Sequence, residues 1–148
     1  MPRFDFRLRG YLNLKSRMED QRRLEYGKAV SDLERERAEL RTLEDRWDET
    51  LAAFKAVINK SVQPQSAIWY NSFLSRLKES IEIQIGNVRK AEEEMDRRRA
   101  ALAQAMKERK MLEILKEKQY AAYVRERNRA EQRSADELVS FRRGSREN

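Results

Sequence analysis

The chain contains no cysteine and no histidine among its 148 residues. Disulfides, thiol chemistry, zinc sites of the usual ligand types and histidine acid–base catalysis are therefore excluded. Proline occurs twice and glycine four times, so few positions would interrupt a helix. No apolar run approaches the roughly 20 residues needed to span a bilayer, and residues 1–10 lack the apolar core of a signal peptide. We therefore expect a soluble protein that is not exported by the usual route.

Charged residues make up 40% of the chain and hydrophobic residues 39%. Such a composition, when it carries a seven-residue repeat, is typical of coiled coils and long helices. Pro64 is the only interior proline, because Pro2 stands at the start. Proline removes a backbone donor and pushes the preceding residue out of the helical region. The segment Asn59–Ser66 is therefore predicted to be the bend between two helices.

Both sides of this bend carry the a/d stripe of a coiled-coil seam, two rows of residues at seven-residue spacing. In the first arm the rows are Tyr26, Leu33, Leu40, Trp47 and Phe54, and Val30, Leu51 and Ile58 with Arg37 and Glu44 as polar interruptions. In the second arm they are Leu74, Ile81, Val88, Met95 and Leu102, and Tyr70, Leu77, Ala91, Ala105 and Leu112 with Gln84 and Arg98 among them.

The predicted fold is all-α: two long helices forming an antiparallel coiled-coil hairpin in a single domain over residues 1–148. We expect a first helix over about residues 8–59, a bend over about 60–66, a second helix over about 67–140 and a disordered basic tail over 141–148. Pairing around the bend would place Tyr26 opposite about Ala100, and residues 125–141 would overhang. Phe4, Phe6 and Leu8 alternate with polar residues as in a strand, but with no partner strand we favour a frayed or late-starting helix.

The net charge of +7 is unevenly distributed. Residues 1–23 carry seven Lys/Arg against three Asp/Glu, residues 107–148 twelve against eight, and residues 24–106 fourteen against fifteen. A hairpin would gather the positive excess at its terminal end and leave the bend without excess charge. The basic end is open to three interpretations: a site for nucleic acid, a fit to an acidic protein cavity, or a solvated face. Interleaved glutamates and the lack of a stacking platform disfavour nucleic acid.

No residues point to catalysis. The sequence has no glycine-rich phosphate loop, and its carboxylates alternate with Lys and Arg along helix faces. The cluster Glu92–Glu93–Glu94–Asp96 is better explained as a solvated face than as a metal site, because consecutive residues point different ways round a helix. We therefore expect a non-enzyme without cofactor, metal or small-molecule ligand.

Aromatic residues gather on both sides of the bend. Trp47, Phe54 and Tyr70 fall in the seam, whereas Trp69 and Phe73 lie four residues apart on its flank. They would either cover the end of the hairpin or form a docking surface for another protein.

These residues resemble the flagellar export protein family FliJ. The likeness rests on Phe4-Asp-Phe-Arg-Leu8, on Trp69-Tyr-Asn-Ser-Phe-Leu-Ser-Arg-Leu77 and on the run from Glu108 to Gln119. It continues through Tyr123, Arg129-Ala-Glu-Gln132 and Asp136-Glu-Leu138. The resemblance implies a small antiparallel coiled coil of the flagellar type III secretion apparatus, similar to the central stalk of rotary ATPases. The terminal end would enter a hexameric export ATPase, the tip would bind the membrane export gate, and export chaperones would be further partners. Such a protein would be cytoplasmic, peripheral to the inner membrane at the flagellar base, and needed for motility and chemotaxis.

The resemblance also implies site residues. In the family, exposed positions near the tip are associated with gate binding, and the corresponding candidates here are Leu43, Trp47, Phe73, Leu77, Ser80 and Gln84. Trp69, on the flank of the seam beside Phe73, is a further candidate for the same surface. The candidates for ATPase binding at the basic end are Arg7, Arg9, Arg125, Arg127, Arg129 and Arg133. Two alternatives remain: a stand-alone escort chaperone for export substrates, and a structural coiled coil that dimerises in parallel. A hairpin would be a monomer of 17.7 kDa.

Overall fold

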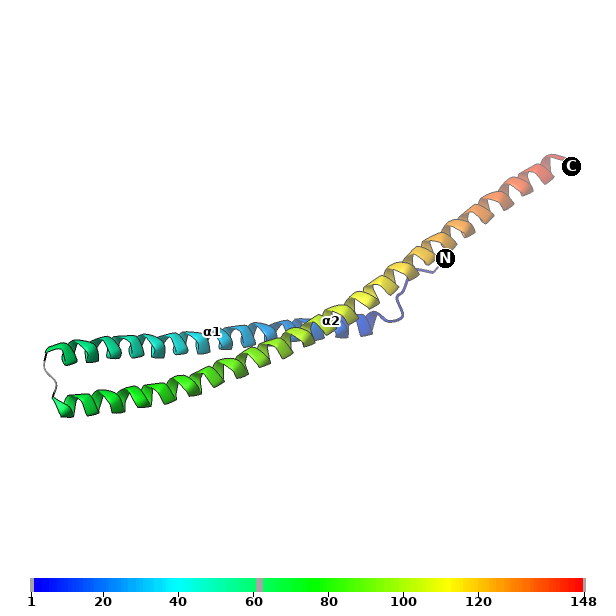
Figure 1. Cartoon of the computed structure of the whole chain (residues 1–148). Coiled ribbons are helices and arrows are strands. Elements are labelled where there is room, and N and C mark those ends of the chain that lie inside the picture. Colours follow the sequence, from blue (N-terminus) through cyan, green and yellow to red (C-terminus); the bar gives the residue numbers. More distant parts are fainter. Residues whose placement is uncertain (1, 61–62, 148) are drawn as a thin grey trace. The chain divides into compact units, whose positions relative to one another are not determined.

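The structure, a computed structural model, describes residues 2–60 and 63–147 and contains two long helices, α1 (Arg9–Lys60) and α2 (Pro64–Glu147). The helices pack against each other in an antiparallel arrangement, which confirms the predicted all-α hairpin (Figure 1). No strand is present in the described part of the chain. Within that part, no helix has a stretch long and apolar enough to cross a membrane.

The start of α2 differs from the prediction. The helix begins at Pro64 rather than near residue 67. Proline suits the first position of a helix, because its missing N–H would have no intrahelical partner there and its φ angle is already helical. The carbonyl of Gln63 accepts hydrogen bonds from the Ser66 N–H at 3.1 Å and the Ala67 N–H at 3.2 Å. The bend was expected over 60–66, of which residues 61–62 lie outside the described residues.

The other end of α2 also differs. The tail predicted to be disordered over 141–148 is helical as far as Glu147, and Asn148 lies outside the described residues. Gly144 is the one glycine in the predicted tail, and the tail also contains arginine and glutamate, which are good helix formers. The helix therefore continues in this tail.

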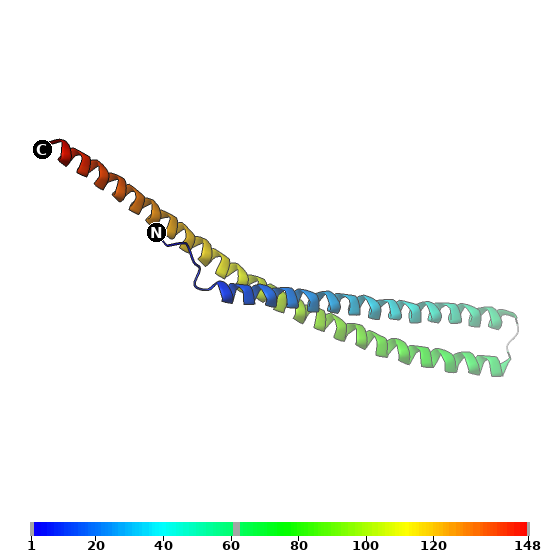
Figure 2. The same cartoon turned by 180° about the vertical axis from the view of Figure 1, so that it is seen from behind.

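The chain divides into two compact units that had not been predicted. One unit holds Gln21–Ala103, and the other holds the residues up to Asp20 together with those from Gln104 onward. In the Gln21–Ala103 unit, α1 and α2 lie side by side from the bend onward (Figures 1 and 2). The predicted seam is confirmed at Leu33, Leu74 and Leu77, which are buried within it, but not at Ile58, which is 42% exposed at the end of α1. The register is confirmed as well: the guanidinium of Arg99 lies 5.9 Å from the centre of the Tyr26 ring.

The second unit includes an N-terminal segment that is not helical before Arg9, which agrees with a late-starting helix, one of the two expected alternatives, and with the start expected near residue 8. Figure 2 shows this segment running along α2. The Phe4 ring packs on Tyr120 at 5.2 Å and on Tyr123 at 5.5 Å between ring centres, and the Tyr123 hydroxyl donates to the Pro2 carbonyl at 2.8 Å. Phe6 is 1% exposed. The alternation that resembled a strand thus lies in a non-helical segment whose Phe4 and Phe6 rings are packed against the protein.

Candidate partner-binding surfaces

We use the name tip surface for the seven candidate gate-binding residues: Leu43, Trp47, Trp69, Phe73, Leu77, Ser80 and Gln84. Its most exposed aromatic side chain is Trp69, at 57%. Trp69 stacks on Phe73, one helical turn further along α2, with ring centres 5.5 Å apart and planes 7° apart. Trp69 also meets Tyr70 edge-on at 5.0 Å, and Tyr70 packs on Phe54 of α1 at 5.2 Å. Packing of Tyr70 into the seam therefore supports a stacked pair on the other side, made of the exposed Trp69 and the half-buried Phe73.

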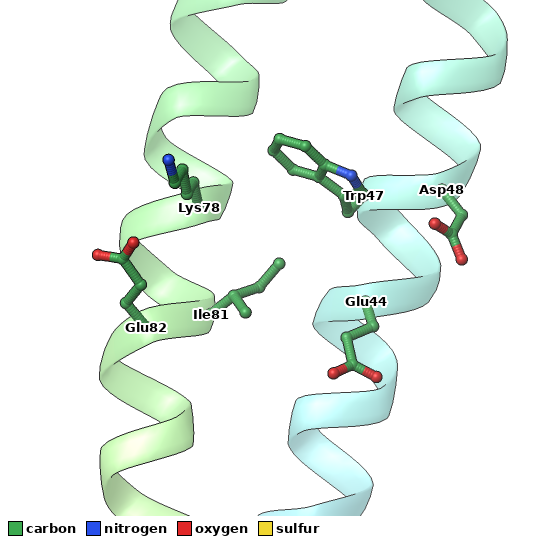
Figure 3. Close-up of a pocket in the computed structure, with 6 residues that line it drawn as sticks. All are labelled: Glu44, Trp47, Asp48, Lys78, Ile81 and Glu82. Atoms are coloured by element: carbon green, nitrogen blue, oxygen red, sulfur yellow. The ribbon is translucent and has the colours of Figure 1, made fainter.

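Trp47 lies in a groove of about 530 Å³ between α1 and α2. Its ring points from α1 towards α2, where Lys78 and Ile81 lie opposite (Figure 3). Three carboxylates complete the lining: Glu44, Asp48 and Glu82. The groove thus combines an apolar floor with a mainly acidic rim. Leu43, one turn before Trp47 on α1, is half-buried.

Two residues of the tip surface are not exposed, although the resemblance implied exposed positions. Leu77 and Gln84 are each only 5% exposed. The Gln84 amide donates to Glu36 on α1, to its carbonyl at 2.9 Å and to its carboxylate at 2.6 Å, and Gln84 accepts from the Asn87 amide at 3.1 Å. Both residues belong to the helix–helix seam, as their heptad positions indicate. The face open to a partner consists of Trp69 and Ser80, with Phe73 half-buried beside them.

The terminal basic surface consists of Arg7, Arg9, Arg125, Arg127, Arg129 and Arg133. All are exposed except Arg127, which is half-buried. The Arg127 Nε atom is buried and has no hydrogen-bond partner among the described residues. From Glu131 to Glu147 every side chain of α2 is exposed, including Leu138 at 59% and Phe141 at 76%. This part of α2 therefore presents both arginines and apolar side chains.

The profile of the FliJ family, described as the flagellar FliJ protein, matches residues 4–148. The chain belongs to the FliJ family. It is therefore a component related to flagellar protein export, and the FliJ family is a non-catalytic part of that system. Among curated proteins and among solved structures, the comparisons gave no match.

Within this FliJ-family chain, the surroundings of the acidic cluster on α2 agree with a solvated face. Glu92 pairs with Arg37 of α1 at 3.0 Å, and Glu94 pairs with Arg98 at 2.8 Å. Asp96 lies 4.0 Å from Arg99. Three of the four carboxylates are thus engaged by arginines.

Polar pairs that cross the seam were not predicted from the sequence. Glu19 is 4% exposed, and its carboxylate accepts a hydrogen bond from Arg109. This bond is the main cause that raises the pKa of Arg109. Arg109 also pairs with Glu113 at 2.8 Å. Lys15 pairs with Glu108 at 3.0 Å, and this bond lowers the pKa of Glu108 and raises that of Lys15.

A signal for the first of these pairs was present in the sequence. Glu19 stands seven residues before Tyr26, and Arg109 stands seven residues after Leu102. Both therefore extend a seam row, and extending the rows through polar residues would have placed these two side chains in the seam. Such polar seam positions fix register at some expense of stability.

Proposed function

We propose that this FliJ-family chain is a non-enzymatic stalk, or adaptor, of the bacterial flagellar export apparatus. Its terminal basic surface would engage a hexameric export ATPase, and its tip surface would engage the export gate. Export chaperones would be further partners, and the protein would act in the cytoplasm, peripheral to the inner membrane at the flagellar base. The observation that carries the proposal is the presence of two exposed surfaces of different chemistry, each in its own unit of one FliJ-family chain.

The ATPase assignment is supported by three arginines on the exposed part of α2. Arg125, Arg129 and Arg133 follow one another at four-residue spacing, so they lie along one stripe of the helix. Guanidinium groups bind carboxylates with two parallel hydrogen bonds and keep their charge at any physiological pH. Such a stripe suits a protein cavity lined with acidic side chains.

The gate assignment is supported by the stacked pair of Trp69 and Phe73. Aromatic side chains are enriched at the energetically dominant positions of protein interfaces. The pair is held in place by Tyr70 and Phe54, so little side-chain freedom would be lost on binding.

The proposal is tested by measuring both affinities for two sets of variants. The triple change Arg125→Gln, Arg129→Gln and Arg133→Gln should weaken ATPase binding by about tenfold or more and leave gate binding unchanged. Phe73→Ala should weaken gate binding by about 30-fold, the effect of a strong interface residue, and leave ATPase binding unchanged. Each variant serves as the control for the other, and far-UV circular dichroism verifies that both remain helical.

Loss of ATPase binding on Phe73→Ala, in a protein that is still helical, would show that the two surfaces are assigned the wrong way round. Capture of filament-type export substrates without any binding to the ATPase would identify the chain as a stand-alone escort chaperone instead.

A further inference from the structure

The residues around the bend form the longest acid-free stretch of the chain. From Thr50 to Lys78 there is no Asp or Glu, whereas there are four cations: Lys55, Lys60, Arg76 and Lys78. The expectation that the bend lacks excess charge is therefore wrong. It rested on a balance over residues 24–106, in which the acidic residues on either side of this stretch cancel its charge.

None of these four cations forms a salt bridge within the described residues. Lys55, Lys60 and Arg76 are exposed, and no salt bridge to any of them occurs within residues 2–60 and 63–147. Lys78 is exposed as well and forms no salt bridge there, but it lines the Trp47 groove, whose other lining residues include Glu44 and Glu82. Elsewhere, cations near the seam, such as Lys15 and Arg98, are paired with glutamates. The positive charge next to the bend is therefore not neutralised by the protein.

The same segment exposes large apolar side chains. Ile58 at the end of α1 is 42% exposed, and Ile68 and Trp69 in the first turns of α2 are 66% and 57% exposed. Tryptophan is enriched where a protein meets the headgroup region of a membrane, because its ring is apolar and its N–H is polar. Lysine and arginine beside such residues are attracted to anionic headgroups.

We propose that the bend-proximal end of the Gln21–Ala103 unit binds directly to an anionic lipid surface. Lys55, Lys60 and Arg76 would interact with lipid phosphates, while Ile68 and Trp69 enter the interface. Charge complementarity favours lipid over a protein partner here: the cations are spread over both helices and have no local acidic counterpart, which suits a negative surface that extends in all directions. The contact needs neither the ATPase nor the gate, so its failure would leave the proposed function untouched.

The first experiment is flotation of the full chain with vesicles. The chain should bind phosphatidylcholine vesicles that contain about 30% phosphatidylglycerol, should not bind pure phosphatidylcholine vesicles, and should be released by about 0.5 M NaCl. The change Lys55→Gln with Lys60→Gln should lower the partition coefficient by about 30-fold, because each cation near such a surface contributes about fivefold. The matched control, Lys107→Gln with Lys110→Gln, removes the same charge from exposed positions of the other unit and should have little effect.

The second experiment uses the two tryptophans, Trp47 and Trp69, as internal reporters. In Trp47→Phe the remaining Trp69 emission should shift to the blue on adding anionic vesicles and should be quenched by brominated lipid. In Trp69→Phe the remaining Trp47 emission should change little.

Three results would overturn the lipid contact. The first is absence of binding to anionic vesicles. The second is equal loss of binding in both lysine pairs, which would indicate attraction by net charge alone. The third is a response from Trp47 and not from Trp69. If Trp69→Ala weakened binding to the gate protein while no vesicle bound the chain, the segment would be a protein-binding surface only.

Discussion

Leu77 and Phe73 lie one helical turn apart on α2, but their surroundings differ. Leu77 is buried against the partner helix, whereas Phe73 is half-buried and stacks on exposed Trp69. A substitution at Leu77 therefore acts first on the helix pair, and a substitution at Phe73 acts first on what the surface can bind. When a tip substitution weakens partner binding, its effect on helix pairing therefore has to be measured separately.

We predict that Leu77→Ala lowers the free energy of unfolding by about 2–4 kcal/mol, because it removes buried methyl groups and leaves a cavity. The control Ser80→Ala, on the same helix but exposed, should change it by less than about 0.5 kcal/mol. Urea unfolding followed by far-UV circular dichroism measures both. Equal free energies of unfolding for the two variants would mean that Leu77 is not buried between the helices.

A second prediction concerns Glu19 and Arg109. Arg109→Leu should lower the midpoint of thermal unfolding, because it leaves the buried Glu19 carboxylate without this partner. Replacing both residues by leucine should recover the midpoint or raise it, since an apolar pair suits the seam. A double variant that is less stable than Arg109→Leu would show that the Glu19 carboxylate stabilises the helix pair by other means.

At the scale of the helices, the seven-residue rows predicted most of what the structure contains. They located the buried face of both helices and their register, because burial of apolar side chains at every a and d position leaves few other ways to pair. The rows could not locate Phe6, whose burial depends on a non-helical segment outside any helical repeat. They also gave no information on residues 131–147 of α2, where every side chain is exposed and helix formation depends on helix propensity alone.

The ion pairs of Glu108 with Lys15 and of Glu25 with Arg22, the first between the helices and the second within α1, predict how stability responds to pH. Hydrogen bonds from Lys15 to Glu108 and from Arg22 to Glu25 are the main causes that lower the pKa of each carboxyl below its ordinary value of 4.5. Their stabilisation is therefore complete above that value and is lost as the pH falls through the lowered pKa. For Lys15, whose pKa is raised above 10.5, stabilisation is complete below 10.5 and is lost as the pH rises through the raised value.

Thermal unfolding at a series of pH values tests this expectation. The midpoint should fall as the pH drops below about 4.5, and Glu108→Gln with Glu25→Gln should flatten that fall. An acid transition of unchanged size in this double variant would assign the transition to other carboxylates.

At the scale of the whole molecule, the chain joins an aromatic surface in one unit to an arginine-rich surface in the other, through two helices that pass through both units. The sequence predicted the family, which residues 4–148 then matched. The family resemblance alone did not distinguish the tip residues that face solvent, because it implied exposure for all of them. The heptad rows placed Leu77 and Gln84 in the seam, whereas Trp69 and Ser80 lie outside these rows and are exposed. A stalk or adaptor requires that both surfaces be usable at the same time.

Formation of a ternary complex tests this requirement most directly. The full chain would be mixed with the cognate export ATPase and with the gate protein in detergent, and the complexes measured by size-exclusion chromatography with light scattering. We predict one species that contains all three proteins, which disappears with Phe73→Ala or with the triple arginine variant while the other binary complex survives. Competition between ATPase and gate for the chain, with no ternary species at saturating concentrations, would contradict the account.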